Sequence, residues 1–147
     1  MNRAQKEATM AYWLLKSEPS SYSWEQLVAD KHTHWDGIRN PQALNNLRAM
    51  KLGDRAFFYH SNEGREIVGV VEVIKTFYPD PADTTGKLGM VDIKPVTPAA
   101  TRAGLAAMRA NPELSGLSLL RQPRLSVCPV TEREWSTLCK MAGIPSR

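Results

Sequence analysis

The chain has 147 residues, of which 42% are hydrophobic and 23% are charged, close to the composition of an ordinary folded domain. This length is enough to bury a hydrophobic core. No apolar run approaches the roughly eighteen residues that a membrane-spanning helix needs, so we expect no membrane partner. The first ten residues contain no apolar stretch of a secretory signal. We therefore expect a flexible leader over residues 1–10 and a single domain over residues 11–147.

The formal net charge of +4 is concentrated in one part of the chain. Residues 84–131 contain six Lys and Arg against two acidic residues, whereas residues 1–83 are nearly neutral. A local basic surface is suited to phosphate or nucleic acid, although a merely well-solvated surface has a similar composition.

The sequence carries none of the common cofactor or metal signatures. It has no GxxxxGK[ST], GxGxxG, HExxH or GxSxG motif. Cys128 and Cys139 form no CxxC pair, and His32 and His34 lie two residues apart on an expected loop with no cysteine nearby. We therefore expect reduced thiols, no metal and no cofactor, and a monomer in the cytoplasm, or in the nucleus if the source is eukaryotic.

In the first half of the chain, apolar runs alternate with capped helices. Ser23 with Gln26 has the pattern of a capping box, and Asn40 before Pro41 is a strong helix start. The expected elements are a strand at 12–15, a helix ending at Asp30, a loop at 31–40, a helix at 41–50 and a strand at 55–60.

The second half contains more strand signals and ends in a helix. Thr131 with Glu134 forms a second capping box. The expected elements are strands at 67–77 and 90–96, the latter closed by Pro98, a helix at 101–110, a strand at 125–130 and a helix that stops at Gly143 and Pro145. Because turns rather than regular helical crossovers join most of the strands, the pattern favours an α+β fold with a mostly antiparallel sheet or small barrel.

The first polar cluster, Lys16-Ser17-Glu18-Pro19, directly follows a strand. An amine, a hydroxyl and a carboxylate at a strand end are able to recognise a polar ring edge or to act as catalytic groups. If the strand continues, alternation points Ser17 away from the other two, which counts against a catalytic triad. A solvated loop is the simpler alternative.

Two further clusters combine aromatic and polar side chains. In the segment 35–40, Trp35 is able to stack on a base. Arg39 is able either to form an ion pair with Asp36 or to bind phosphate. The alternative is that Trp35 belongs to the core and that the ion pair is structural. In the segment 57–61, alternation places Phe57, Tyr59 and Ser61 on one face of a strand, and one face must be core.

The fourth cluster opens the last expected strand. Arg121, Gln122 and Arg124 suit bidentate contacts with phosphate or with a base edge. A solvated strand entry with surface ion pairs is the alternative.

Together these clusters resemble the EVE domain, a member of the PUA-like superfamily related to YTH and ASCH domains, and in particular the thymocyte nuclear protein 1 type of eukaryotic EVE protein. The matching segments occur in family order: 12–19 (YWLLKSEP), 22–24 (YSW), 35–40 (WDGIRN), 45–50 (NNLRAM), 58–61 (FYHS), 67–73 (IVGVVEV), 78–81 (YPDP), 124–127 (RLSV) and 129–130 (PV). Each segment alone is weak, and the ordered set is specific.

The resemblance implies a small, mostly antiparallel β-barrel flanked by helices. It also implies a pocket for a nucleobase turned out of its DNA or RNA strand, one modified for example as 5-methyl- or 5-hydroxymethylcytosine. The family places the following positions near the pocket, and side-chain chemistry suggests their roles: Trp24, Trp35 and Tyr59 for stacking, Lys16, Ser17, Asn40 and Ser61 for the base edge, and Arg39, Arg121 and Arg124 for the backbone.

Two other functions remain open at this point. Related ASCH domains include small amidohydrolases that act on acylated cytidines through a Lys, a hydroxyl residue and a Glu. A protein-interaction domain with a degenerate pocket is the third reading, because Pro41 and Leu44 stand where the family usually has an aromatic residue and an Arg, and residues 84–89 lack a frequent Trp.

Overall fold

A computed structural model describes residues 11–145, and the expected leader at 1–10 lies outside these residues. The elements, in chain order, are β1 (Tyr12–Ser17), α2 (Trp24–Asp30), β2 (Thr33–Trp35), α3 (Pro41–Ala49), β3 (Arg55–His60), β4 (Glu66–Pro79), β5 (Gly89–Gly104), α4 (Leu105–Arg109), the 3-10 turn η1 (Pro112–Leu114), α5 (Ser118–Arg121), β6 (Val127–Val130) and α6 (Glu132–Ala142).

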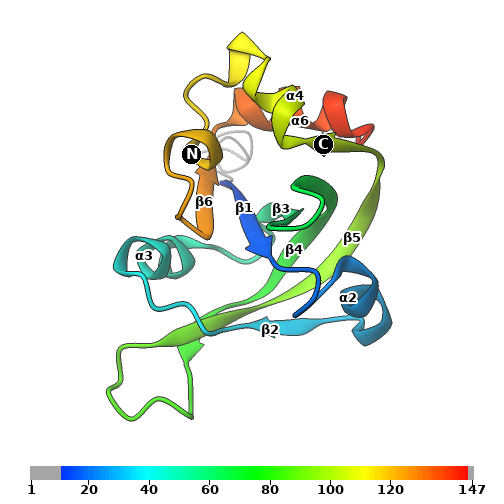
Figure 1. The fold of residues 1–147 in the computed structure, drawn as a ribbon. Coiled ribbons are helices and arrows are strands. Elements are labelled where there is room, and N and C mark those ends of the chain that lie inside the picture. The colour runs from blue at the N-terminus through cyan, green and yellow to red at the C-terminus, as the bar shows by residue number, and fades with distance from the viewer. Residues whose placement is uncertain (1–10, 146–147) are drawn as a thin grey trace, which may run out of the picture.

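The strands form one mixed sheet in the order β2-β5-β4-β3-β1-β6 (Figure 1). The β1–β3 ladder is parallel, and the other four ladders are antiparallel. The predicted α+β class with a mostly antiparallel sheet is therefore confirmed. Within residues 11–145 no ladder joins the edge strands β2 and β6, so the expected barrel does not close.

Most predicted elements are present, with differences around β2 and β5. Residues 33–35, expected in a loop, form β2 because they pair with β5. Pro98 does not end β5, which continues to Gly104 and shortens the helix expected at 101–110 to Leu105–Arg109. Pro95 and Pro98 are tolerated because both lie at register shifts of the β4–β5 ladder, where its regular hydrogen bonding is interrupted.

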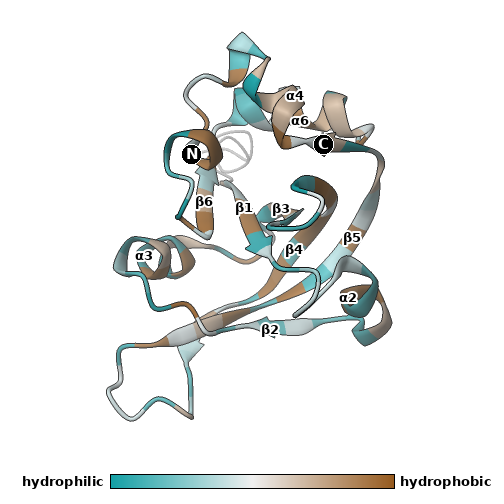
Figure 2. Cartoon of the chain, viewed as in Figure 1, coloured by the Kyte–Doolittle hydropathy of each residue, from teal (hydrophilic) through white to brown (hydrophobic). Residues whose placement is uncertain are grey.

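The core lies on both faces of the sheet, so the central strands are apolar almost throughout (Figure 2). On one face Phe57 stacks on Trp135 of α6 with ring centroids 4.0 Å apart. On the other, Phe58 packs against Trp24 and Trp35 at 5.8 and 5.5 Å. Both faces of β3 therefore contribute to the core.

The helices are short and locally specified. Ser23, Asn40 and Thr131 accept backbone N–H groups as N-caps of α2, α3 and α6, and Thr131 completes the predicted capping box with Glu134. Gly143 ends α6 with a φ of 64°, a conformation that favours glycine. Among the residues that the structure describes, no helix is long and apolar enough to cross a membrane.

Gly69 of β4 allows the Trp24 ring to lie directly on the sheet. A Cβ at this position would stand 2.4 Å from the Trp24 ring. We expect Gly69→Ala to lower the free energy of unfolding by about 1–3 kcal/mol, because the buried indole has to shift. Urea denaturation followed by circular dichroism measures this cost. Gly116→Ala, which meets nothing nearer than 3.9 Å, is the control; an equal effect of both variants would contradict the packing argument.

Candidate functional site

The parallel ladder between β1 and β3 brings the carboxyl ends of two strands to the same place. Lys16 pairs with Tyr59, and Ser17 with His60. The segment before β6 lies on the other side of β1, where the Lys16 N–H donates to the Ser126 carbonyl at 3.0 Å. Three segments that are far apart in sequence therefore meet here.

These segments and α4 enclose a cavity of about 510 Å³, which we call the Lys16 cavity. Its lining combines cations, one carboxylate, hydroxyls and three apolar side chains. The lining residues are Lys16, Glu18, Tyr59, Ser61, Asn62, Arg65, Leu105, Arg109, Leu119, Pro123 and Ser126.

Burial affects two polar groups of the Lys16 cavity, the Lys16 amine and the Tyr59 hydroxyl. The Lys16 ammonium donates to the Pro123 carbonyl at 2.7 Å, and burial lowers the pKa of this amine. Burial raises the pKa of the Tyr59 hydroxyl, an effect that Arg65 and Arg109 oppose. Three cations against the single carboxylate of Glu18 make this cavity suited to an anionic or polar ligand.

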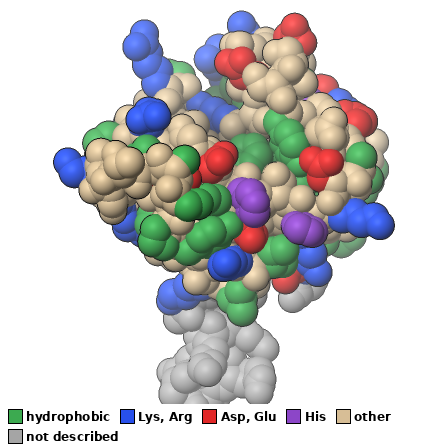
Figure 3. All heavy atoms as spheres, turned by 90° about the horizontal axis from the view of Figure 1, so that it is seen from below, with side chains coloured by type: hydrophobic (Ala, Val, Ile, Leu, Met, Phe, Trp, Pro, Cys, Tyr) green, Lys and Arg blue, Asp and Glu red, His purple; other side chains and the backbone are tan. Residues whose placement is uncertain are grey.

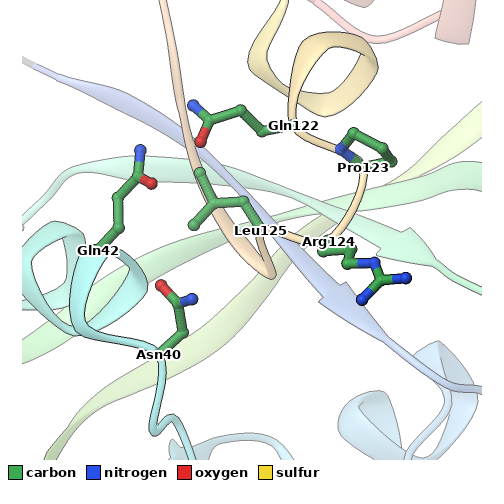
Figure 4. Close-up of a pocket in the computed structure, with 6 residues that line it drawn as sticks. All are labelled: Asn40, Gln42, Gln122, Pro123, Arg124 and Leu125. Atoms are coloured by element: carbon green, nitrogen blue, oxygen red, sulfur yellow. The ribbon is translucent and has the colours of Figure 1, made fainter.

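A second cavity of about 350 Å³ lies beside the first and shares Pro123 with it. Its other lining residues are Asn40, Gln42, Gln122, Arg124 and Leu125, and we call it the amide cavity. Figure 4 shows the amides of Gln42 and Gln122 near each other beside Leu125, whereas the Arg124 guanidinium points away from them.

Two of the predicted site residues lie in the interior. The Ser17 hydroxyl is buried and donates to the Tyr22 carbonyl at 2.5 Å. The Trp24 ring is 6% exposed, and its backbone N–H donates to His60 Nε2 at 3.1 Å. Burial lowers the pKa of His60, consistent with a neutral ring that accepts this bond. Neither Ser17 nor Trp24 lines the two cavities described above.

Trp35 lies at a third cavity, of about 270 Å³, on the other side of the sheet from Tyr59. Its ring is 9% exposed and packs edge-on against Phe58 and Tyr22. The remaining lining residues are Thr33, His34 and Asp36.

The three predicted phosphate-binding arginines, Arg39, Arg121 and Arg124, are all exposed. Within residues 11–145 no ion pair joins Arg39 to Asp36. Seen from below, basic and acidic side chains are dispersed over one face of the molecule, with two histidines near its middle (Figure 3). That face therefore has no continuous basic surface.

The structure thus brings Lys16, Tyr59 and Ser61 together in one cavity and Asn40 with Arg124 in the next. Sequence reasoning missed Arg65 and Arg109 as members of the site. Arg65 follows an exposed turn and belongs to no recognisable motif. Arg109 was noted in the sequence only as one of the six basic residues of the segment 84–131.

The two departures from the usual family pattern differ in their environment. Pro41 is exposed at the first position of α3, and Leu44, three residues further along the helix, is buried, 4% exposed. Leu44 therefore contributes to packing and not to the described surface.

Comparison with known protein families identifies the chain. The model of the EVE domain family matches residues 11–141. The chain belongs to the EVE domain family. The resemblance read from the sequence is thereby confirmed.

Relatives of this EVE domain occur in bacteria and vertebrates. It is 36% identical to thymocyte nuclear protein 1 of Gallus gallus, over 89% of this chain and 68% of that protein. A solution structure of a protein from Rhodopseudomonas palustris superposes with a TM-score of 0.87 at 52% identity, covering 91% of this chain and 94% of that one. The crystal structure of human THYN1 protein in complex with 5-methylcytosine-containing DNA superposes with a TM-score of 0.83 at 33% identity, covering 92% and 100%.

Proposed function

We propose that this EVE domain binds DNA and holds a cytosine that carries a 5-methyl group, turned out of its strand, in the Lys16 cavity. The observation that carries the proposal is the grouping of Lys16, Glu18, Tyr59 and Ser61 in one cavity, with Arg65 and Arg109 among its lining residues. The DNA complex of human THYN1, which shares the fold, supports the ligand class.

The lining of the Lys16 cavity matches the groups of a methylated cytosine. The base offers an amino group, ring and carbonyl acceptors, and an apolar methyl group. Glu18 is a carboxylate acceptor for the amino group, and Lys16 is a donor for the acceptors. Leu105 and Leu119 provide apolar surface for the methyl group. Arg65 and Arg109 then bind the phosphates on either side of the extruded base.

Tyr59 is an aromatic side chain that lines this cavity. It is only 3% exposed, so we propose that the base stacks on the part of its ring that borders the cavity. Stacking contributes about 1–3 kcal/mol per base, comparable to the few kcal/mol that extrusion of a paired base costs. We accordingly propose that Trp24 stabilises the core and does not contact the base. Arg39, Arg121 and Arg124 stay predicted contacts with the DNA backbone outside the cavity.

The arrangement favours binding over hydrolysis. An amidohydrolase that used Lys16, Ser17 and Glu18 would need all three groups at one reacting bond. Ser17 is instead buried with its hydroxyl on the Tyr22 carbonyl, whereas Lys16 and Glu18 line the cavity. We propose a monomeric binding module that acts where chromosomal DNA lies, in a bacterial cytoplasm or a eukaryotic nucleus.

The test is fluorescence anisotropy with matched oligonucleotides that contain cytosine, 5-methylcytosine or 5-hydroxymethylcytosine at one position. Single- and double-stranded DNA and RNA are compared at two salt concentrations. We expect 5-methylcytosine DNA to bind most tightly, and Lys16→Met to weaken its binding at least fivefold, because a hydrogen bond to a charged group contributes about 1.5–3 kcal/mol.

Lys94→Met is the matched control, since Lys94 is exposed on β5 and outside the described cavities. It should leave the affinity for 5-methylcytosine DNA unchanged. Equal, salt-sensitive binding of all oligonucleotides would mean attraction to the backbone alone and would overturn the proposal. Release of a nucleoside product from acetylated cytidine would favour the enzyme instead.

A further inference from the structure

The amide cavity has a different chemistry from the Lys16 cavity beside it. Its lining includes three primary amides over the apolar surface of Pro123 and Leu125. The Asn40 Oδ1 accepts the Ala43 N–H at 2.9 Å, so its Nδ2 group remains as a donor. Within residues 11–145 the side-chain amides of Gln42 and Gln122 have no hydrogen-bond partner. Each of these two therefore offers a donor and an acceptor to a ligand.

The wall between the two cavities is fixed by hydrogen bonds to its backbone. The Leu125 N–H donates to the Gln122 carbonyl at 3.0 Å, which closes a turn. The Lys16 ammonium holds the Pro123 carbonyl, and the Cys128 thiol donates to the Leu125 carbonyl at 3.2 Å. A segment centred on Pro123, whose backbone is fixed by these hydrogen bonds, thus separates the two cavities.

Amides that are unpartnered among the described residues, on a fixed backbone beside the apolar surface of Pro123 and Leu125, are suited to the edge and face of a nucleobase. On the N6–N7 edge a primary amide makes two hydrogen bonds to adenine, one as donor and one as acceptor, whereas guanine offers two acceptors at the same edge. The Arg124 guanidinium points away from the amides (Figure 4). In this orientation it is able to contact a phosphate of a bound strand.

We infer that the amide cavity is a second base subsite, which reads the nucleotide next to the extruded methylcytosine and prefers adenine there. The inference rests on the proposed function, because the Lys16 cavity must hold the modified base for its neighbour to reach the amide cavity. The domain then selects a short sequence context and not only a modification.

The test uses single-stranded DNA with a central 5-methylcytosine and each of the four bases in turn at the 5′ and at the 3′ neighbour. Competition anisotropy measures the affinity of each oligonucleotide. At one of the two neighbours we expect adenine to bind about fivefold or more tightly than the other bases, the lower limit for a bidentate pair. Gln42→Ala combined with Gln122→Ala should reduce this ratio to below twofold.

Two controls separate the subsite from folding and from the proposed function. Gln26→Ala changes an exposed glutamine on α2 and should retain the adenine preference. Both glutamines of the amide cavity are exposed, so thermal melting should show that the double variant folds. Ratios below twofold at both neighbours, or an adenine preference that survives in the double variant, overturn the inference.

A parallel series keeps the neighbours fixed and places either cytosine or 5-methylcytosine at the centre. Its ratio of affinities measures selection of the modified base by the Lys16 cavity alone. Preference for the methylated base without any neighbour effect refutes the second subsite and leaves the proposed function standing. Loss of the preference for the methylated base, with or without a neighbour effect, refutes the proposed function and the inference with it.

Discussion

Replacing Trp135 by alanine is expected to lower the free energy of unfolding by about 3–5 kcal/mol, the usual cost of removing a large buried aromatic side chain. Trp135 is 2% exposed and lies between two rings, with centroid distances of 4.0 Å to Phe57 and 4.4 Å to Tyr12. It thereby attaches α6 to β1 and β3, the strands whose ends form the Lys16 cavity. Urea denaturation monitored by circular dichroism measures the loss.

Trp135→Phe and Leu52→Ala are the controls for this prediction. Among the described residues the buried Trp135 Nε1 has no hydrogen-bond partner, so phenylalanine keeps a stacked ring and removes an unsatisfied donor. We expect Trp135→Phe to cost less than about 1.5 kcal/mol. Leu52 is 68% exposed, and its truncation should change stability by less than about 0.5 kcal/mol. Equal losses for Trp135→Ala and Leu52→Ala would contradict the stacking argument.

Replacing Arg65 and Arg109 together by glutamine is expected to weaken binding to every DNA by a similar factor. If each arginine contacts one phosphate, the slope of log affinity against log salt should become shallower by about 2, since each contact contributes about 0.9. The wild-type protein should then lose roughly tenfold more affinity than the variant between 50 and 200 mM salt. Anisotropy titrations across salt concentrations measure the slope.

The arginine prediction has a matched control and a distinct failure. Arg133 is exposed on α6 and lines none of the described cavities, so Arg133→Gln should leave the slope unchanged. Arg65 and Arg109 are proposed to contact the backbone, so the ratio of affinities for methylated and plain DNA should persist in the double variant. Collapse of that ratio at an unchanged slope would mean that the arginines contact the base instead.

The local part of the fold could be predicted from the sequence. Ser23, Asn40 and Thr131 begin their helices as expected, because an N-cap bonds to a backbone group only three residues ahead. The strand at 55–60 was predicted with its observed bounds, since its aromatic and apolar residues are buried on both faces. The ordered motifs of the EVE family also lie in the sequence and identified the family, whereas the α+β class followed from the pattern of strands and turns.

What the sequence by itself determined was therefore the starts of α2, α3 and α6, the central strands and the family. Only the tertiary structure decided that β2 is a strand, because three residues become a strand only when β5 supplies their hydrogen bonds. It likewise decided that Trp24 lies in the core and that Arg65 and Arg109 line the cavity of Lys16. These side chains are separated by tens of residues along the chain, and strand pairing and packing, which no local pattern encodes, bring them together.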